Sequence, residues 1–341
     1  MSAIVRVMLP AMPMFDMTGP ELRAHRSDVT PPDDLQEFWA GTLAAARALG
    51  GTPTLTPTAT PLRLIETFDV TFPGYAGDPI KAWLHRPAGA SEALPCVVEY
   101  RGYGGGRGLA HEVVHWAVAG YAHFVMDSRG QGSDSTTGET PDPHPSTVAQ
   151  PGVMTRGILD RDTYYYRRLF TDAVRAVDAV RALPQVDATR VAVAGASQGG
   201  GMSLAVAGLV PDLVGVMTDV PYLCDMRRAT EIGDKEPYGE IVRYLKAHRD
   251  QVDRVFETLR YFDGAVLATL ATAPALFSVA LMDEICPPST VYAAYNAYGG
   301  PKEIREYAYN EHEGGGPFHD LARLTWLAAL LPAPSAPSSP S

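Results

Sequence analysis

A serine between small residues is the first sign of chemistry in the sequence. Gly195-Ala196-Ser197-Gln198-Gly199 follows the apolar run VAVA and precedes the helical stretch GGMSLAVAGLV. This order of strand, tight turn and helix is the setting of the G-x-S-x-G nucleophile elbow, which raises a serine hydroxyl above a sheet. The helix that follows supplies backbone N–H groups near a developing oxyanion. We therefore predict that Ser197 is a catalytic nucleophile rather than part of a structural glycine turn.

A nucleophilic serine needs a histidine base and an acid that orients the base. In folds with this elbow, the order along the chain is serine, acid, histidine. His312 lies in a glycine-rich loop after the last predicted strand, whereas His319 lies on the last helix, where we expect a cap or surface residue. Asp283 directly follows the preceding strand, and we expect the adjacent Glu284 to be a solvated loop charge. The sequence thus predicts the triad Ser197, Asp283 and His312.

The negative oxygen of an acyl-transfer intermediate needs two backbone donors. One is the N–H group that follows the nucleophile, which belongs to Gln198, and the other comes from the loop after the third strand. That loop reads YRGYGGG over 100–106. Its glycines allow backbone conformations that aim N–H groups inward. We predict that the N–H of Tyr103 is the second donor, the alternative being a flexible glycine turn.

A competing motif, His111-Glu112-Val113-Val114-His115, matches the H-E-x-x-H signature of zinc hydrolases. It falls within a predicted helix over 109–119, on which both imidazoles would share one face. No histidine follows His115 at three or six residues, and the other candidate ligand, Glu139, lies in an irregular loop. Because the serine hydrolase set is complete, the sequence favours a solvated helix face here, with no metal and no cofactor. A non-catalytic binding protein is disfavoured because no triad position is damaged.

The elements that must position these residues alternate between short apolar runs and helical stretches. The runs lack polar alternation, as is typical of strands buried on both faces of a sheet. They cover 96–100, 122–127, 190–194, 214–220, 275–281 and 304–307, and the helices cover 109–119, 163–183, 199–210, 289–298 and 318–331. This alternation predicts an α/β fold with a mostly parallel, doubly wound central sheet. Before it, we expect a helix over 33–49 and two antiparallel strands over 62–86.

We expect a single domain over residues 1–331, which begins with an arm and a helix over 1–60. Two insertions interrupt the alternation. The first, 133–162, is a loop rich in proline, threonine and glycine, and loops of that length are usually functional or mobile. The second, 221–273, carries helical patterns over 241–248 and 252–261 and would cap the carboxyl edge of the sheet. The Pro/Ser-rich tail 332–341 is expected to be disordered.

Composition excludes several classes of protein. The chain of 341 residues carries 28 basic and 39 acidic residues, a net charge of −11, which disfavours binding to nucleic acid. No apolar run approaches the roughly 20 residues of a membrane helix. The N-terminal residues do not read as a secretory signal, and three widely spaced cysteines give no disulfide framework. These observations predict a cytoplasmic protein with a small-molecule substrate and no nucleic-acid or membrane partner.

The motifs together resemble the acetyl xylan esterase/cephalosporin C deacetylase family, carbohydrate esterase family 7. Its three signatures are present as Arg129-Gly130-Gln131, Gly195-Ala196-Ser197-Gln198-Gly199 and His312-Glu313. The resemblance continues through GVMTRGILD, TYYYRRLFTDAVRAV and LMDEICPPSTVYAAYN, and covers nearly the whole chain apart from the tail. One departure is Arg101-Gly102-Tyr103, where the family usually has His-Gly-Tyr. The arginine changes the charge expected beside the pocket.

The resemblance implies an α/β-hydrolase that removes acetyl groups from small substrates such as acetylated xylo-oligosaccharides and cephalosporin C. It implies the same triad, with Tyr103 and Gln198 in the oxyanion hole and with Arg129 and Gln131 as structural support. It also implies a homo-oligomer, commonly a hexamer, whose active sites face an internal cavity. An acyltransferase or another small-ester hydrolase on this fold is the alternative. Hydrolysis and transfer differ only in whether water or another acceptor takes the acyl group from the enzyme.

Overall fold

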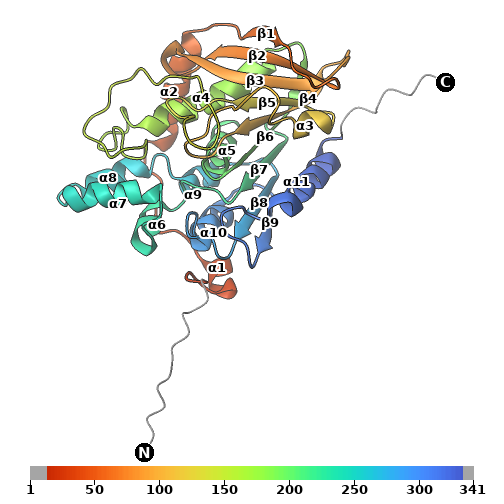
Figure 1. Ribbon diagram of the computed structural model, residues 1–341. Helices are drawn as coiled ribbons and strands as arrows, with labels where there is room; N and C mark the ends of the chain where they lie inside the picture. Colours follow the sequence, from red (N-terminus) through yellow and green to blue (C-terminus); the bar gives the residue numbers. More distant parts are fainter. Residues whose placement is uncertain (1–13, 333–341) are drawn as a thin grey trace, which may run out of the picture.

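A nine-stranded sheet forms the centre of the computed structural model, which describes residues 14–332 (Figure 1). Its strand order is β1-β2-β3-β5-β4-β6-β7-β8-β9. The strands are β1 Thr54–Thr58, β2 Ile65–Pro73, β3 Pro79–Pro87, β4 Leu94–Tyr100, β5 Ala122–Met126, β6 Val186–Ala196, β7 Gly215–Asp219, β8 Ala275–Ala280 and β9 Lys302–Tyr307. The first three pair antiparallel, β3 pairs antiparallel with β5, and all later pairs are parallel. The mostly parallel sheet predicted from the sequence is confirmed.

Burial explains which residues became strands. Every residue of β4, β5, β7 and β8 is buried, and these strands are mostly apolar without polar alternation, as expected, with Glu99, His123 and Asp219 as charged or titratable exceptions. The expectation of burial on both faces is wrong for β9, which is the edge strand and has no buried residue. The sequence analysis also missed β1, because its threonines and its proline read as a loop. β1 pairs only with β2 at the opposite edge, where proline is tolerated.

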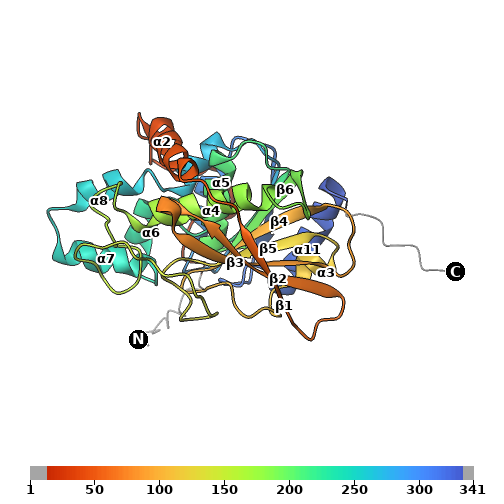
Figure 2. The ribbon, with the colours of Figure 1, turned by 90° about the horizontal axis from the view of Figure 1, so that it is seen from above.

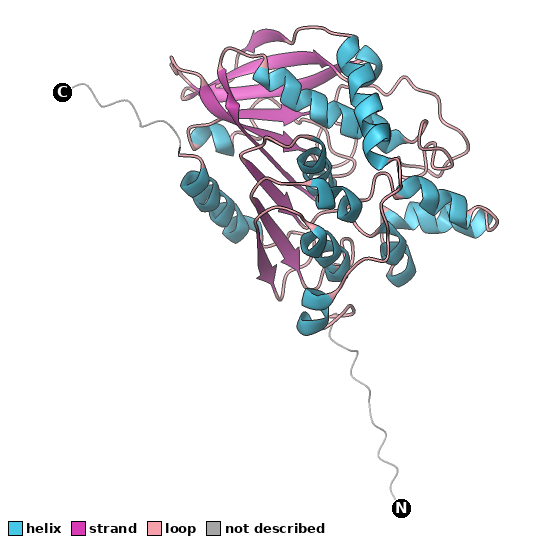
Figure 3. Cartoon of the chain, turned by 180° about the vertical axis from the view of Figure 1, so that it is seen from behind, coloured by secondary structure: helices cyan, strands magenta, loops and turns pink. Residues whose placement is uncertain are grey.

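Helices cover both faces of the sheet (Figures 2 and 3). One face carries α3 His115–Val118 and α11 Gly316–Leu330, whose Trp116 and Leu327 pack with Val97, Ala192 and Met217 of the strands. The other core is larger and includes side chains of α2 Leu35–Ala48, α4 Tyr165–Arg181, α5 Gln198–Leu209 and α10 Pro288–Ala297. A short helix, α1 Gly19–Ala24, packs near α10, where Asn296 donates to the Leu22 carbonyl. Such covering of both faces is what a parallel sheet requires.

The two insertions take the forms expected from the sequence. Residues 133–162 form an irregular loop whose one β-bridge joins Ser133 to Thr137. Residues 221–273 hold α6 Met226–Ile232, α7 Tyr238–Ala247, α8 Val252–Leu259, α9 Gly264–Leu267 and the 3₁₀ turn η2 Ala268–Leu270. Figure 1 shows α6, α7 and α8 on the same side of the sheet as the loop. The Met154 N–H donates to Glu240 of α7 at 3.0 Å, so loop and helical cap touch each other.

Other expectations meet different outcomes. The two antiparallel strands over 62–86 are confirmed as β2 and β3, which the 3₁₀ turn η1 Tyr75–Gly77 separates. The predicted helix over 109–119 is wrong, because only 115–118 is helical and the preceding residues form turns. The tail beyond Pro332 and the first 13 residues lie outside the described part of the chain. Among residues 14–332, no helix combines the length and apolar character needed to cross a bilayer.

Candidate active site

Ser197 stands at the sharp turn between β6 and α5. Its backbone has φ 57° and ψ −121°, a strained conformation for a residue with a side chain. Small neighbours allow the turn, because a Cβ on Gly195 would lie 2.4 Å from the backbone of Gly199. A Cβ on Gly199 would lie 2.2 Å from the carbonyl oxygen of Tyr100 on β4. This strand–turn–helix geometry is the one expected of a nucleophile elbow.

His312 and Asp283 come together from two loops at the same edge of the sheet. The Nδ1 atom of His312 lies 2.8 Å from an oxygen of Asp283. Asp283 follows β8 and is fully buried, and its other oxygen accepts the backbone N–H groups of Ile285 at 2.8 Å and Cys286 at 2.9 Å. These bonds fix the carboxylate, and the carboxylate in turn orients the imidazole. Ser197 and His312 line one cavity of about 370 Å³.

His319 corrects one expectation, because it is neither a cap nor a surface residue. It is 2% exposed and lies beside the same cavity. Its Nε2 is 2.8 Å from Asp219 and its Nδ1 is 3.0 Å from the hydroxyl of Tyr307. Both ring nitrogens of His319 therefore have hydrogen-bond partners. Among residues 14–332, His312 has such a partner only at Nδ1. Glu284 is the loop charge expected, since it forms an exposed ion pair with Lys235.

The oxyanion loop is tied to the elbow by two glutamines. The buried side chain of Gln198 accepts a hydrogen bond from Gln131 at 3.0 Å. Gln131 in turn accepts the backbone N–H of Gly104 at 2.7 Å. Gln198 also donates to the Arg101 carbonyl at 3.3 Å. The residues predicted to supply and support the oxyanion hole thus lie in one hydrogen-bonded group, next to Tyr103.

Glu240 is a residue of this region that sequence reasoning missed. This carboxylate of α7 is 4% exposed and accepts hydrogen bonds from the Tyr103 hydroxyl and the Met154 N–H. The Tyr103 hydroxyl accepts the Val153 N–H at 2.7 Å. Burial raises the pKa of Glu240 to about 7, although both hydrogen bonds to it act in the opposite direction. No sequence signal marks it, since a glutamate on an amphipathic helix normally faces solvent.

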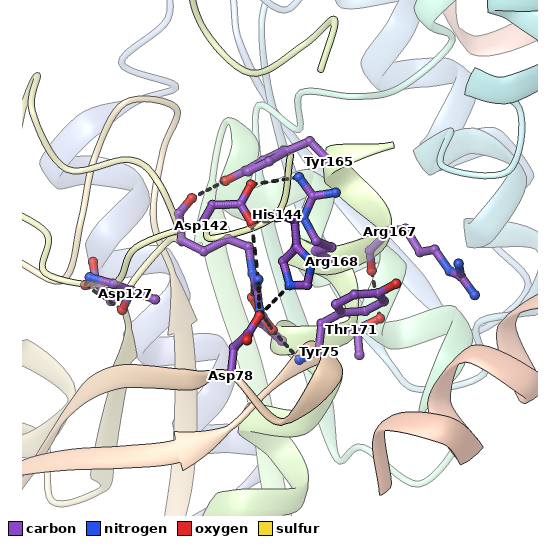
Figure 4. Close-up of polar contacts among 12 residues, drawn as sticks. Tyr75, Asp78, Asp127, Asp142, His144, Tyr165, Arg167, Arg168 and Thr171 are labelled. Carbon is purple, nitrogen blue, oxygen red and sulfur yellow. Dashed lines mark hydrogen bonds and ion pairs between the residues drawn. The ribbon is translucent and has the colours of Figure 1, made fainter. Parts of the chain in front are cut away.

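Arg129 holds the loop after β5 through buried ion pairs. Its guanidinium, which is fully buried, makes two bonds to Asp172 of α4, at 2.5 and 2.8 Å. It also donates to Asp78 at 2.9 Å and to Asp142 at 3.3 Å. Figure 4 shows Asp78, Asp142, His144 and Arg168 gathered in this network. Within residues 14–332 no hydrogen bond or ion pair joins Arg129 directly to the predicted triad, which fits a supporting position.

The zinc-hydrolase motif does not form the geometry that its signature requires. His111 and Glu112 are exposed and precede α3, which begins at His115, so the two histidines do not share a helix face. The expected solvated helix face is found only in part: His111 and Glu112 are exposed but not helical, and His115 turns its Nε2 atom toward the carboxylate of Glu99. Glu139, the remaining candidate ligand, pairs with Arg107.

One group of potential ligand atoms overlaps the triad. Atoms of Asp283, Cys286 and His312 lie within 4.8 Å of one another. Burial raises the pKa of the Cys286 thiol, so the thiolate that a metal prefers is suppressed, and Asp283 already accepts the N–H groups of Ile285 and Cys286. This arrangement matches an acid–base pair better than a metal centre. A second cavity of about 500 Å³, between residues of α6 and α8, contains no triad residue.

Comparisons with known proteins place the chain. A family model described as acetyl xylan esterase (AXE1) matches residues 12–330. An acetyl xylan esterase from Paenibacillus sp. R4 is 38% identical, with a TM-score of 0.88, and the match covers 92% of this chain and 100% of that one. Acetyl xylan esterase 1 from Thermoanaerobacterium sp. JW/SL YS485 is 32% identical, with a TM-score of 0.86 and coverages of 93% and 99%.

More distant relatives match part of this chain or share its fold. The acetyl esterase Axe7A of Xylanibacter ruminicola is 29% identical over 197 residues, which are 58% of this chain but only 44% of that protein. An acylaminoacyl peptidase of Pyrococcus horikoshii, 17% identical with a TM-score of 0.59 over 82% of this chain and 44% of that one, shows the α/β-hydrolase fold alone. The family match spans both insertions and every loop that carries Ser197, Asp283 and His312. This chain therefore belongs to the acetyl xylan esterase family of carboxylic ester hydrolases.

Proposed function

We propose that this chain hydrolyses acetyl esters of small O-acetylated molecules by a serine mechanism, with Ser197 as nucleophile, His312 as base and Asp283 as orienting acid. One observation carries the proposal. Ser197, on its strained turn, lines the same cavity as His312, whose Nδ1 is bonded to buried Asp283. That bond leaves Nε2 of the imidazole for the proton of the serine hydroxyl.

The reaction proceeds in two steps. His312 takes the proton of Ser197 while the serine oxygen attacks the acetyl carbonyl carbon. The tetrahedral intermediate collapses, the bond from carbon to the alcohol oxygen breaks, and the alcohol leaves with the proton from His312. Water then attacks the acetyl-enzyme with His312 again as base, which releases acetate and restores Ser197. The buried Asp283 stabilises the imidazolium in both steps.

Two backbone N–H groups, those of Gln198 and Tyr103, stabilise the oxyanion in this proposal. The first sits at the start of α5, so the dipole of the helix supports the same negative charge. The second, that of Tyr103, lies on the loop that Gln131 connects to Gln198 by hydrogen bonds. The side chain of Tyr103 is hydrogen-bonded to Glu240. Loss of one such donor typically lowers kcat by about 10²–10³-fold.

Small acetylated substrates fit the surroundings of the site. A cavity of about 370 Å³ lies near the lower end of the range of about 300–1,000 Å³ typical of ligand pockets. The loop 133–162 and the helical cap meet at Met154 and Glu240, next to the side chain of Tyr103. Two of the relatives are acetyl xylan esterases and a third is an acetyl esterase. We propose acetylated xylo-oligosaccharides as the substrate class, with cephalosporin C as a second small ester.

Assembly and location belong to the same proposal. A homohexamer with enclosed sites would exclude polymeric xylan, and size-exclusion chromatography with light scattering measures the assembly. All three cysteines are buried and unpaired, which supports a reducing, cytoplasmic setting. A monomer that deacetylates polymer as fast as oligomer would contradict the enclosed site but not the triad.

Kinetics of Ser197→Ala test the mechanism. We expect kcat/KM for p-nitrophenyl acetate to fall roughly 10⁴-fold or more with the fold intact. Ser203→Ala is the matched control, since Ser203 is a buried serine of α5, the helix that follows Ser197, and its hydroxyl donates to the Gly199 carbonyl. A folded Ser197→Ala protein with near wild-type turnover would overturn the serine mechanism.

The substrate range is a separate measurement. Acetate, butyrate and octanoate esters are compared, together with acetylated xylo-oligosaccharide and cephalosporin C. We expect kcat/KM to fall steeply with acyl length, because extra methylenes overpack a small pocket. Preference for octanoate would contradict an acetylesterase. Faster transfer of acetyl to an added alcohol than to water would identify an acyltransferase.

A further inference from the structure

A carboxylate and two histidines converge beside the oxyanion loop from three elements. Glu99 is near the end of β4, His115 begins α3 and His123 is on β5. The Nε2 atom of His123 is 3.0 Å from Oε2 of Glu99, and the Nε2 atom of His115 is 3.5 Å from that same oxygen. The three ligand atoms lie within 4.8 Å of one another. None of these residues has a role in the proposed hydrolysis.

Hydrogen bonding alone leaves this cluster incomplete. His123 is fully buried and can donate to Glu99, which satisfies one nitrogen. The side chain of His115 is 39% exposed, but its Nε2 atom is turned inward toward the carboxylate and has no hydrogen-bond partner within the described residues. Buried polar atoms are rarely left without a partner, and such an atom points to a group that completes it.

The distances are close to those of a tetrahedral zinc site. With metal–ligand bonds of about 2.0–2.2 Å, two ligand atoms of a tetrahedron are about 3.3–3.6 Å apart. The separation of 3.5 Å from His115 to Glu99 lies in that range, the 3.0 Å from His123 to Glu99 is slightly shorter, and the two histidine nitrogens lie within 4.8 Å of each other. We propose that Glu99, His115 and His123 form a Zn²⁺ site with three protein ligands. Two imidazoles and one carboxylate are a donor set that zinc accepts, with water in the fourth position.

The neighbouring arginines do not block a cation at this place. Arg101 donates to Oε1 of Glu99 at 3.1 Å, so it holds the oxygen that faces away from the histidines. Arg323 is occupied by Asp219 at 2.8 Å and by Asp320, and these two carboxylates offset its charge. Arg101 then acts as an outer contact that fixes the ligating carboxylate, as is common around metal sites.

The site would join β4, which directly precedes the loop that carries Tyr103, to α3 and β5, which follow that loop. Glu99 also lines the cavity that contains Ser197 and His312. The triad is complete without the metal, so the proposed role is to hold these elements together rather than to take part in hydrolysis. Zinc binding and ester hydrolysis are therefore measured independently, and failure of either proposal leaves the other intact.

The experiment uses the full chain purified without a polyhistidine tag, treated with EDTA and desalted. ZnCl₂ is titrated by calorimetry, the bound zinc is measured by mass spectrometry, and the melting temperature is recorded with and without zinc. We expect one zinc per chain and a higher melting temperature. Loss of an outer contact usually weakens metal binding by about 10–100-fold, so His115→Ala, which removes a ligand, should weaken it by at least that factor.

Matched variants decide where zinc binds. His111→Ala removes an exposed histidine of the same segment and should bind zinc like the wild type. Glu99→Gln keeps the shape of the side chain and should weaken binding as His115→Ala does. His312→Ala removes the other cluster of potential ligands and should leave binding unchanged. The proposal is overturned if the wild type binds no stoichiometric zinc, if His115→Ala binds normally, or if His312→Ala abolishes binding.

Discussion

Replacement of Arg129 by methionine tests whether the first signature motif stabilises the fold. The guanidinium is fully buried and pairs with Asp172, also fully buried, through two bonds of 2.5 and 2.8 Å. Without it, Asp172 keeps only the backbone N–H of Tyr75, at 2.8 Å. Removal of one partner from a buried ion pair costs about 3–5 kcal/mol, because the other charge stays buried and unpaired. We expect Arg129→Met to lower the free energy of unfolding by that amount.

Arg47→Met is the matched control. Arg47 makes the same kind of two-bond pair with Asp178, at 2.9 and 3.1 Å, but its side chain is 47% exposed. A surface pair of this kind contributes about 0–1 kcal/mol. Both variants are unfolded with urea at one protein concentration and followed by circular dichroism. Asp178 is also left with a bond from Arg175 at 2.8 Å, whereas within residues 14–332 Asp172 is left with no cation. Burial and the remaining partner both predict a smaller loss for Arg47→Met, so equal losses of stability would refute this reasoning.

The pH dependence of Arg129→Met gives a second check. Burial already raises the pKa of Asp172, and loss of the arginine raises it further. A carboxyl group whose pKa is higher in the folded state favours unfolding as pH rises, because the folded state then holds more protons. The stability lost in Arg129→Met should therefore be smaller near pH 5 than near pH 8. The double variant Arg129→Met/Asp172→Asn should recover part of the loss at pH 8.

Three further predictions concern the site. His312→Ala should lower kcat/KM for p-nitrophenyl acetate by about 10²–10⁴-fold, because it removes the proposed base. His319→Ala should retain turnover, but its free energy of unfolding should fall by about 1–3 kcal/mol because Asp219 and Tyr307 lose their buried partner. The reverse pattern would show that the base is misassigned. Glu240→Gln removes a carboxyl group whose folded pKa of about 7 lies above the ordinary 4.5. The wild type should thus lose stability relative to this variant as pH rises from about 5 to 8 in urea unfolding, and a constant difference would contradict the raised pKa. EDTA should leave acetate-ester hydrolysis unchanged at a temperature where the protein stays folded, and activity that EDTA removes and zinc restores would require metal in the reaction.

Local sequence pattern was sufficient for much of the architecture. Strands buried on both faces are mostly apolar and lack polar alternation, so β4, β5, β7 and β8 stand out between amphipathic helices. The elbow was predictable for the same reason, since only small residues at 195 and 199 let β6 and α5 meet so closely at Ser197. Edge strands lack this constraint. β1 was missed and the burial of β9 was misjudged because one side of each strand is unpaired.

Most pairs between side chains distant in the sequence could not be predicted from local pattern, and Asp283–His312 is the exception. The Asp283–His312 pair followed from the order of residues along loops, a rule about topology that the sequence preserves. The burial of His319 against Asp219 depends on how α11 packs on the sheet, and the two residues are 100 positions apart in the chain. Glu240 likewise meets Tyr103 across 137 positions.

The sequence by itself therefore determined the central strands and their mostly parallel arrangement, the elbow and the residues predicted to form the triad. The strands and the elbow depend on neighbours within one or two elements, where periodicity and turn chemistry act directly, and the predicted triad depends on the order of its loops along the chain. Only the tertiary structure decided that His115 leaves the His111-Glu112 motif and joins Glu99 and His123. Two strands, β4 and β5, and the helix α3 must first pack together before those side chains meet. The free energy that selects this packing comes from the whole core rather than from the motif.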